Sequence, residues 1–331
     1  MNVGLDGGFA GFKLVKASKQ TTYPAIVGSV FDETYGTNGH RSRELLQPRH
    51  VLYGQAAMNE ASLITRVENR GWYTSKQFID LMLAGLTELS AAVVVSADVV
   101  TCLPYDYMGM AGKVAKRLSN TYKVRRPDRE EQTVVVNVIG VVPQGWAAFI
   151  TQAHDTQGKR TEIIKNDHKY GMVDFGGHTT NFETMHGLRT LDGQCKSVDV
   201  GVWKVIGQVK TMIGNRYSQL HLNDHQLVEA VKAGKVMVKQ REVSIASMVR
   251  RAVKPFAEHL VVQAQNLWED GTGIDTIYLA GGGASLFGDA IAKAFRDITK
   301  PLDDVDLVYA NAIGCYRYAL KLAQKRQAQD G

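Results

Sequence analysis

Apolar and polar positions divide the chain into short strand-like runs and longer helix-like segments. The opening predicts a strand over 2–5, a glycine-rich turn over 6–11 and a second strand over 12–17. A polar stretch over 32–49 predicts a loop. In the segment 75–90, apolar residues recur at helical spacing and predict a helix with one apolar face, formed by Phe78, Leu81, Met82, Leu86 and Leu89.

Strands and helices continue to alternate through the first half of the chain. The β-branched run 93–103 predicts a buried strand that ends before Pro104, and a helix is expected around 107–119. A strand, a hairpin and another strand then follow through Val141. Pro143 suits the first turn of the next helix, where its missing N–H is not needed. We expect this helix to lead out of a first domain.

The second half repeats this organisation. Strand 170–174, a glycine-rich turn at 176–177 and strand 179–185 predict a second hairpin that follows an acidic residue. The later pattern predicts a helix over 244–268 with a buried apolar stripe, a strand over 276–280, and helices over 284–295 and about 310–327. This alternation predicts two α/β domains with mixed sheets and a cleft between them.

Composition agrees with two globular domains. The chain has 331 residues, of which 44% are apolar and 22% charged, enough to bury two cores. The net charge of +6 is concentrated at 123–129 and 321–326, which we interpret as a solvated hairpin tip and a helix end. The long-range field leaves room for an anionic partner, but direct sequence-specific binding of nucleic acid is not expected.

Cysteine usage and hydropathy favour the cytoplasm. Cys102, Cys195 and Cys315 lie far apart and lack the spacing of a metal site or a disulfide framework. The chain opens without the charged region and apolar core of a signal peptide, and it has no apolar run of 18 residues. We therefore expect no membrane span.

The first candidate motif is the glycine-rich turn that follows the first strand. Glycines allow positive φ and close backbone approach, so several N–H groups can converge on phosphate oxygens. Lys13 would add a positive charge, and Asp6 suits a Mg²⁺ ion held through water molecules. A plain hairpin turn is the competing interpretation. The candidate binding residues here are Asp6, Gly7, Gly8, Phe9, Ala10 and Lys13.

The second motif repeats the order of acidic residue, glycine pair and returning strand. Asp174 precedes Gly176 and Gly177, and His178 and Thr179 follow them. Two such turns that face each other would clamp a polyphosphate. The alternative is one more turn with β-favouring threonines behind it.

The third motif places three consecutive glycines between a strand and a helix. Gly281, Gly282 and Gly283, followed by Ala284, would let a flat base or ribose lie against bare backbone. The helix N-terminus there also favours an anion. A helix-entry turn without a ligand explains one or two glycines, but three are costly in chain entropy. Neither a GxxxxGK[ST] loop nor a GxGxxG helix start is present, which disfavours P-loop and Rossmann sites.

The order and context of these motifs resemble the phosphate-1, phosphate-2 and adenosine motifs of the actin superfamily of ATPases. The segments 143–148 and 309–314 look like the two connecting helices of that family. The resemblance implies an α/β actin-like fold with two ribonuclease-H-like domains flanking a nucleotide cleft. It implies domain I at 1–150 plus 310–331 and domain II at 151–309. The short chain looks most like the ParM-like plasmid-segregation and archaeal actins.

The resemblance also implies residue roles. Asp6 and Asp174 would hold Mg²⁺ through its water shell, and Lys13 would contact the β- and γ-phosphates. Gln144 matches the position that orients the attacking water, and Asp174 is the better candidate for helping to take the proton. Such hydrolysis depends mainly on positioning and charge stabilisation.

Some positions depart from the family pattern or fit it loosely. Relatives often carry Ser or Thr in the first turn, where this chain has Phe9 or Ala10, so a hydroxyl contact to phosphate is in doubt. Within 223–239, Glu229 and Lys232 are possible ribose or base contacts, and surface charge is the competing interpretation. His178 is not expected to act as a general base, because related turns need no imidazole.

Three functions agree with these residues. The first is an ATP-driven or GTP-driven filament for plasmid or DNA segregation or cell organisation, with self-association and an adaptor protein bound to DNA as its partners. The second is a small-molecule, sugar-type kinase of the same superfamily, although no acceptor site is evident. The third is a non-polymerising nucleotide-binding adaptor, against which the presence of Asp6, Lys13, Gln144 and Asp174 argues.

Overall fold

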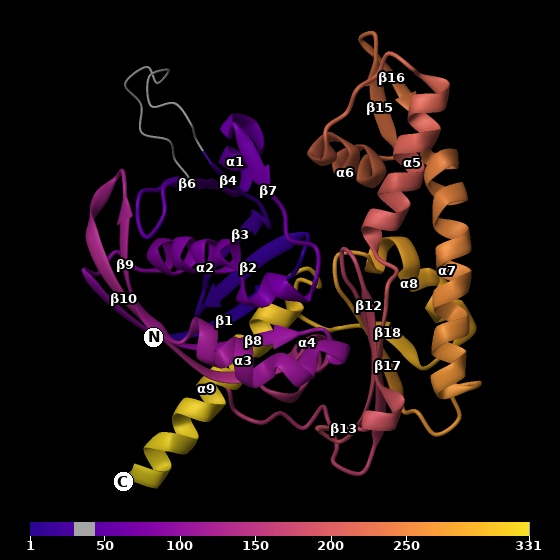
Figure 1. Cartoon of the computed structure of the whole chain (residues 1–331). Coiled ribbons are helices and arrows are strands. Elements are labelled where there is room, and N and C mark those ends of the chain that lie inside the picture. The colour runs from indigo at the N-terminus through magenta and orange to yellow at the C-terminus, as the bar shows by residue number, and fades with distance from the viewer. Residues whose placement is uncertain (30–43, 331) are drawn as a thin grey trace.

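The computed structural model describes residues 1–29 and 44–330. Two mixed sheets, each covered by helices on both faces, form the two halves seen in Figure 1. Most of the loop expected at 32–49 lies outside the described residues, and its last part contains a short strand, β5 (Glu44–Leu45).

The first sheet has six strands in the order β3-β2-β1-β8-β10-β9. The expected opening hairpin is confirmed, and β1 and β10 both run parallel to β8. Alternate residues of β1 face opposite sides, because Leu5 joins the core on which α2 packs while Gly4 lies directly against α9. The strands are β1 (Asn2–Gly7), β2 (Gly11–Lys16), β3 (Lys19–Pro24), β8 (Val94–Leu103), β9 (Asn120–Arg126) and β10 (Arg129–Pro143), and the helices on them are α2 (Lys76–Leu89), α3 (Ala111–Leu118) and α9 (Ala310–Asp330).

The second sheet has the order β13-β12-β11-β17-β18, and β14 pairs with β12. Its hairpin β11–β12 repeats the opening hairpin, as the sequence predicted. Helix α4 covers one face, and α7 and α8 cover the other. The elements are α4 (Gln144–Ala153), β11 (Lys169–Phe175), β12 (Thr180–His186), β13 (Arg189–Thr190), β14 (Lys196–Val198), α5 (Val202–Arg216), α7 (Ala246–Trp268), β17 (Thr276–Ala280), α8 (Ala284–Ala294) and β18 (Thr299–Pro301).

Smaller elements extend each half at the top of Figure 1. A four-stranded sheet on the first half has the order β5-β6-β4-β7, and a two-stranded hairpin joins α6 and α7 on the second. These elements are β4 (Val27–Ser29), β6 (Val51–Tyr53), α1 (Gly54–Glu60), β7 (Leu63–Thr65), α6 (Asp224–Ala233), β15 (Lys235–Val238) and β16 (Arg241–Ser244). The described residues also form 3-10 turns outside these extensions: η1 (Arg70–Thr74), η2 (Tyr105–Met110) and η3 (Asp192–Gln194).

Several details of the sequence analysis were wrong. The strand expected to be buried over 93–103 begins with exposed residues, Val93 and Val94, and the helix expected around 107–119 is a 3-10 turn up to Met110 followed by α3. Pro143 ends β10 and is the N-cap of α4, so it lies before the first turn of that helix and Gln144 is the first helical residue. The stretch 123–129 does form a hairpin, but Arg126 is buried and donates a 2.9 Å hydrogen bond to the Tyr53 hydroxyl. Only part of that tip is therefore solvated.

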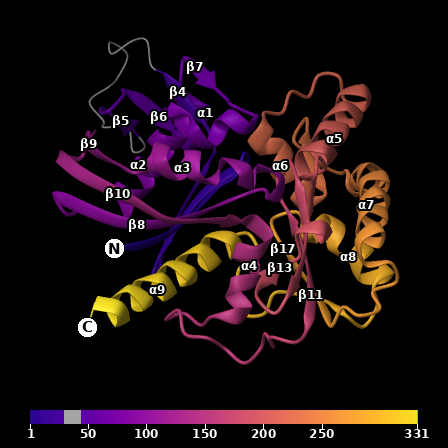
Figure 2. The same ribbon diagram turned by 60° about the horizontal axis from the view of Figure 1, so that its bottom comes forward.

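The last helix joins the two halves. Figure 2 shows α9 running beneath the first sheet and beside α4, and α9 packs against β1, β8 and α4. A Cβ on Gly314 would overlap the carbonyl oxygen of Ala147, so the two helices cross with their backbones in contact. Among the described residues, no helix is long and apolar enough to cross a membrane.

Candidate functional site

A cleft of about 520 Å³ lies between the two halves, and all three glycine-rich turns reach it. This volume is within the range of small-molecule and cofactor sites. The cleft is lined by most of the residues predicted from the motifs: Asp6, Gly8, Phe9, Ala10, Lys13, Gln144, Asp174, Gly176, Gly177, His178, Thr179, Glu229, Lys232, Gly281 and Gly282. The structure therefore brings together segments that are more than 270 positions apart in the sequence.

Three predicted residues do not line the cleft. Gly7 lies against Phe78, and its carbonyl accepts a 2.7 Å hydrogen bond from Trp72 Nε1. A Cβ on Gly283 would lie 3.0 Å from side-chain atoms of Phe175 and Val202. Close packing at Gly7 and Gly283 is a structural reason for glycine there, and Ala284 begins α8 behind the turn.

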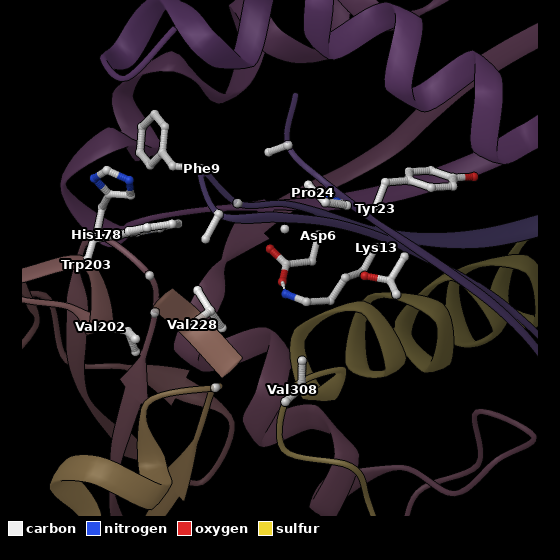
Figure 3. Close-up of a pocket in the computed structure, with 18 of the residues that line it drawn as sticks. Asp6, Phe9, Lys13, Tyr23, Pro24, His178, Val202, Trp203, Val228 and Val308 are labelled. Carbon is white, nitrogen blue, oxygen red and sulfur yellow. Dashed lines mark hydrogen bonds and ion pairs between the residues drawn. The ribbon is translucent and has the colours of Figure 1, made fainter. Parts of the chain in front are cut away.

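The first two turns touch each other across the cleft. The Cβ of Ala10 leaves no room for a side chain at Gly177. The ring of Phe9 packs edge-on to His178, with centroids 5.5 Å apart, and Figure 3 shows these two side chains side by side. His178 also lies 6.3 Å from the ring of Trp203, and burial lowers its pKa. This histidine forms part of an aromatic cluster with Phe9 and Trp203.

An ion pair lies at the bottom of the cleft. Lys13 Nζ donates a 2.9 Å hydrogen bond to Asp6 Oδ2, drawn as a dashed line in Figure 3. Burial would lower the pKa of Lys13, but the carboxylates of Asp6 and Asp174 outweigh it and raise that pKa. Lys13 therefore stays protonated, with its charge held next to the first turn.

Asp174 is a second carboxyl group in the same place. Its side chain is buried, and Asn311 Nδ2 donates a 2.8 Å hydrogen bond to it from α9. Burial, together with the Asp6 carboxylate, raises the pKa of Asp174 to about 6. A cation would relieve the repulsion between two such carboxyl groups, so this pair fits a Mg²⁺ ion held through water.

Gln144 connects the two halves at this point. Its amide nitrogen donates to Asp6 Oδ1 at 3.3 Å, and its amide oxygen accepts from Asn181 Nδ2 at 3.1 Å. Ser197 Oγ in turn donates to Asn181 Oδ1 at 2.7 Å. These hydrogen bonds fix which end of the Gln144 amide faces Asp6.

The third turn is built by backbone hydrogen bonds. Gly281 has a φ of +87°, which favours glycine, and its N–H donates to the Leu307 carbonyl at 3.0 Å. The N–H of Gly283 donates to the Phe175 carbonyl at 3.0 Å. The turn is thereby attached to the end of β11, next to Asp174.

Several functional candidates were missed in the sequence analysis. Asn181, Glu183 and Asn311 are buried polar residues that contact Gln144, its neighbour Gly145, or Asp174. Asn181 ends the second motif and Asn311 lies in the segment 309–314, but neither of them was singled out as a site residue. Glu229 and Lys232 lie on α6 as an exposed ion pair of 3.1 Å.

Comparison with known proteins decides the family. The model of the N-terminal domain of actin-like proteins matches residues 4–146, and that of the C-terminal part of the archaeal actin homologue, MreB-like, matches 172–293. The chain belongs to the actin superfamily. An archaeal actin homolog of Thermoplasma volcanium is 24% identical to this actin-like protein over 331 residues, covering 96% of this chain and 98% of that relative.

Solved structures agree with this actin-like fold. The crystal structure of Ta0583, an archaeal actin homolog, superposes with a TM-score of 0.79 at 20% identity over 98% of this chain and 99% of that one. Its complex with ADP gives 0.78 at 21% identity, with the same coverage. A 15-stranded ParM filament from Clostridium botulinum gives 0.77 at 17% identity over 96% and 98%.

Proposed function

We propose that this actin-like protein binds ATP with Mg²⁺ in the cleft, hydrolyses it, and assembles into filaments. The observation that carries the proposal is the convergence of three glycine-rich turns on one cleft that also contains Asp6, Lys13, Gln144 and Asp174. The ADP complex and the ParM filament among proteins of the same fold support it.

The proposed roles follow the geometry of the cleft. Backbone N–H groups of the first and second turns, together with Lys13, bind the phosphates, and the third turn holds the ribose and base. Asp6 and Asp174 hold the water shell of Mg²⁺, which supplies charge neutralisation for the transferred phosphoryl group. Gln144 orients water, and Asp174 helps to accept its proton.

We also propose a domain organisation, a mode of assembly and a cellular task for this protein. We infer domain I at 1–150 plus 310–331 and domain II at 151–309, with ATP binding at their boundary. Head-to-tail contacts that do not close would give a helical filament in the cytoplasm. Segregation of plasmid DNA through a DNA-bound adaptor is the task that we propose for it.

The test combines light scattering with phosphate release. With ATP and Mg²⁺ we expect scattering to rise and phosphate to appear, and Asp174→Asn should bind ADP but release phosphate at least roughly 100-fold more slowly. Thr272→Ala, on an exposed turn outside the cleft, is the control and should behave as the wild type.

Other outcomes separate the alternatives. A protein that binds ATP but never scatters light at any salt concentration would contradict filament assembly and favour an adaptor. Phosphate transfer to sugars above the rate with water alone would favour a kinase. Assembly with GTP but not ATP would mean that the protein binds GTP in place of ATP. The proposals of hydrolysis and filament assembly would be unaffected.

A further inference from the structure

Strand β12 presents two buried polar side chains to the start of α4. Asn181 and Glu183 lie two positions apart, so they project from the same face of the strand, and neither is exposed to solvent. Asn181 holds the Gln144 side chain, as described above. Glu183 Oε1 accepts a 3.1 Å hydrogen bond from the backbone N–H of Gly145, the next residue of α4.

Glu183 supplies the cap that α4 lacks within its own sequence. The first N–H groups of a helix have no partner inside the helix, and the N-cap residue often satisfies one of them. The N-cap of α4 is Pro143, which has no side chain able to do so. The Glu183 carboxyl group on β12 takes the place of the missing N-cap side chain. It lies at the N-terminus of α4, where the helix dipole favours a hydrogen-bond acceptor.

The fit between Glu183 and α4 is close. A Cβ on Gly145 would lie 3.0 Å from the carboxyl carbon and from Oε1 of Glu183. Glycine at this position lets the carboxyl group approach the backbone. The other oxygen, Oε2, has no hydrogen-bond partner among the described residues. Capping of α4 is thus the hydrogen-bonding role that the structure gives this buried acid.

The cap bears directly on the proposed chemistry. Gln144 is the first residue of α4, and its amide nitrogen lies 3.3 Å from Asp6. A shift of the first turn of α4 would therefore move this amide. Glu183 itself does not line the cleft.

We propose that Glu183 is a positioning residue for nucleotide hydrolysis, which holds the first turn of α4 so that Gln144 places the attacking water. This inference rests on the proposed function. It makes the rate of the chemical step depend on a residue that never touches the nucleotide. Displacements of about 1 Å can cost up to roughly 100-fold in rate.

The experiment compares two substitutions of the same residue. Glu183→Asp keeps the carboxyl group but withdraws it from Gly145 by one methylene, whereas Glu183→Gln keeps an acceptor at the original length. Burial and the charge of Asp174 raise the pKa of Glu183 to about 8, so the neutral Gln side chain resembles the protonated acid. We expect E183D to lower kcat for ATP roughly 10- to 100-fold with KM and the Kd for ADP within about two-fold, and E183Q to stay near the wild type.

The matched control is Thr184→Ala. Thr184 is the next residue of β12, is equally buried, and accepts a 2.8 Å hydrogen bond from Trp268 Nε1 on the opposite face. A comparable loss of Tm with unchanged kcat is expected for T184A. If T184A lowers kcat as much as E183D, or if E183D turns over ATP like the wild type, the inference is wrong.

A second measurement reports on the cap itself. Hydrogen exchange in the peptide 143–150 should accelerate in E183D and remain unchanged in E183Q and T184A; unchanged exchange in E183D would also overturn the inference. Should E183D not fold, Gly145→Ala displaces the carboxyl group from the other side and should lower kcat in the same way. A wild-type chain that binds ADP without hydrolysing ATP would contradict the proposed function instead.

Discussion

Two buried carboxyl groups, one in the cleft and one beside it, have pKa values that differ from those in water. Glu183 and Asp174 are buried carboxyl groups whose pKa values are raised to about 8 and about 6. Neither has a cation as direct partner in the described hydrogen bonds and ion pairs. The protein therefore carries an energetic cost in this region, as is common where side chains serve chemistry.

This cost predicts a dependence of stability on pH. The folded pKa of Glu183, about 8, lies above the unfolded value of 4.5, so the folded state binds the proton more tightly. Its contribution is fully present below pH 4.5 and is lost as the pH rises through 8, with a slope of up to about 1.4 kcal/mol per pH unit in between. E183Q should remove this slope. Thermal unfolding of both proteins from pH 5 to 9, without nucleotide or Mg²⁺, measures the difference, and parallel Tm curves would contradict it.

The residues of the site were only partly predictable from sequence. Asp6, Lys13, Gln144 and Asp174 were identified because each belongs to a motif of glycines or a connecting helix, and the structure brings them together. Asn181, Glu183 and Asn311 were missed because their roles arise from pairing across elements far apart in sequence. A strand pattern shows which side a residue faces but not which helix will cover it.

Among the elements, α4 and α9 cross without room for a side chain between them. A Cβ on Gly314 would overlap a backbone atom of α4, and backbone cannot move aside as a flexible side chain can. The sequence analysis predicted both helices, α4 from Pro143 and α9 as the last helix of the chain, but it did not reveal this contact. The predicted start of α4 was also wrong: Pro143 was expected in the first turn but is the N-cap. A proline fits either position.

The crossing leads to a stability prediction. Gly314→Ala should lower the free energy of unfolding by roughly 3 kcal/mol or more, because α4 and α9 would have to separate. Gly207→Ala in α5 is the control, since a Cβ there meets nothing within 4 Å and the helix should gain roughly 0.5–1 kcal/mol. Thermal unfolding followed by circular dichroism compares them. Equal Tm values for both variants would show that the crossing can relax.

At the scale of the whole molecule, contacts across the cleft decide how freely a ligand enters. Arg66, which follows β7, forms a 2.8 Å ion pair with Asp224 at the start of α6. Both residues line the cleft, and their side chains are about one-third exposed, at 36% and 31%. This pair ties the two smaller extensions together, on either side of the opening.

Removal of this ion pair should speed nucleotide exchange. A partly exposed pair contributes up to about 1 kcal/mol, so Arg66→Gln should release ADP roughly two- to five-fold faster, with a smaller effect at high salt. Lys235→Gln is the control, because its 2.8 Å pair with Glu242 lies within the β15–β16 hairpin. Stopped-flow displacement of ADP by excess ATP measures the rates. Equal rates for R66Q and the wild type would mean that the pair does not restrain opening.

At this scale, the division into two halves that each contain a sheet with a hairpin was predictable. The same order of acidic residue, glycines and returning strand occurs twice in the sequence. The extensions were not, because their short strands carry little periodicity. The domain boundaries at 150 and 310 remain a prediction.

The aromatic cluster beside the second turn also gives the protein an intrinsic fluorescent probe of the cleft. Of the four tryptophans, Trp203 lines the cleft, whereas Trp72 and Trp268 are almost completely buried and Trp146 packs edge-on to Tyr318. Light emitted by an indole depends on the polarity and water around it. An occupant of the cleft changes those surroundings for Trp203 first, so binding and release can be followed on the unlabelled chain.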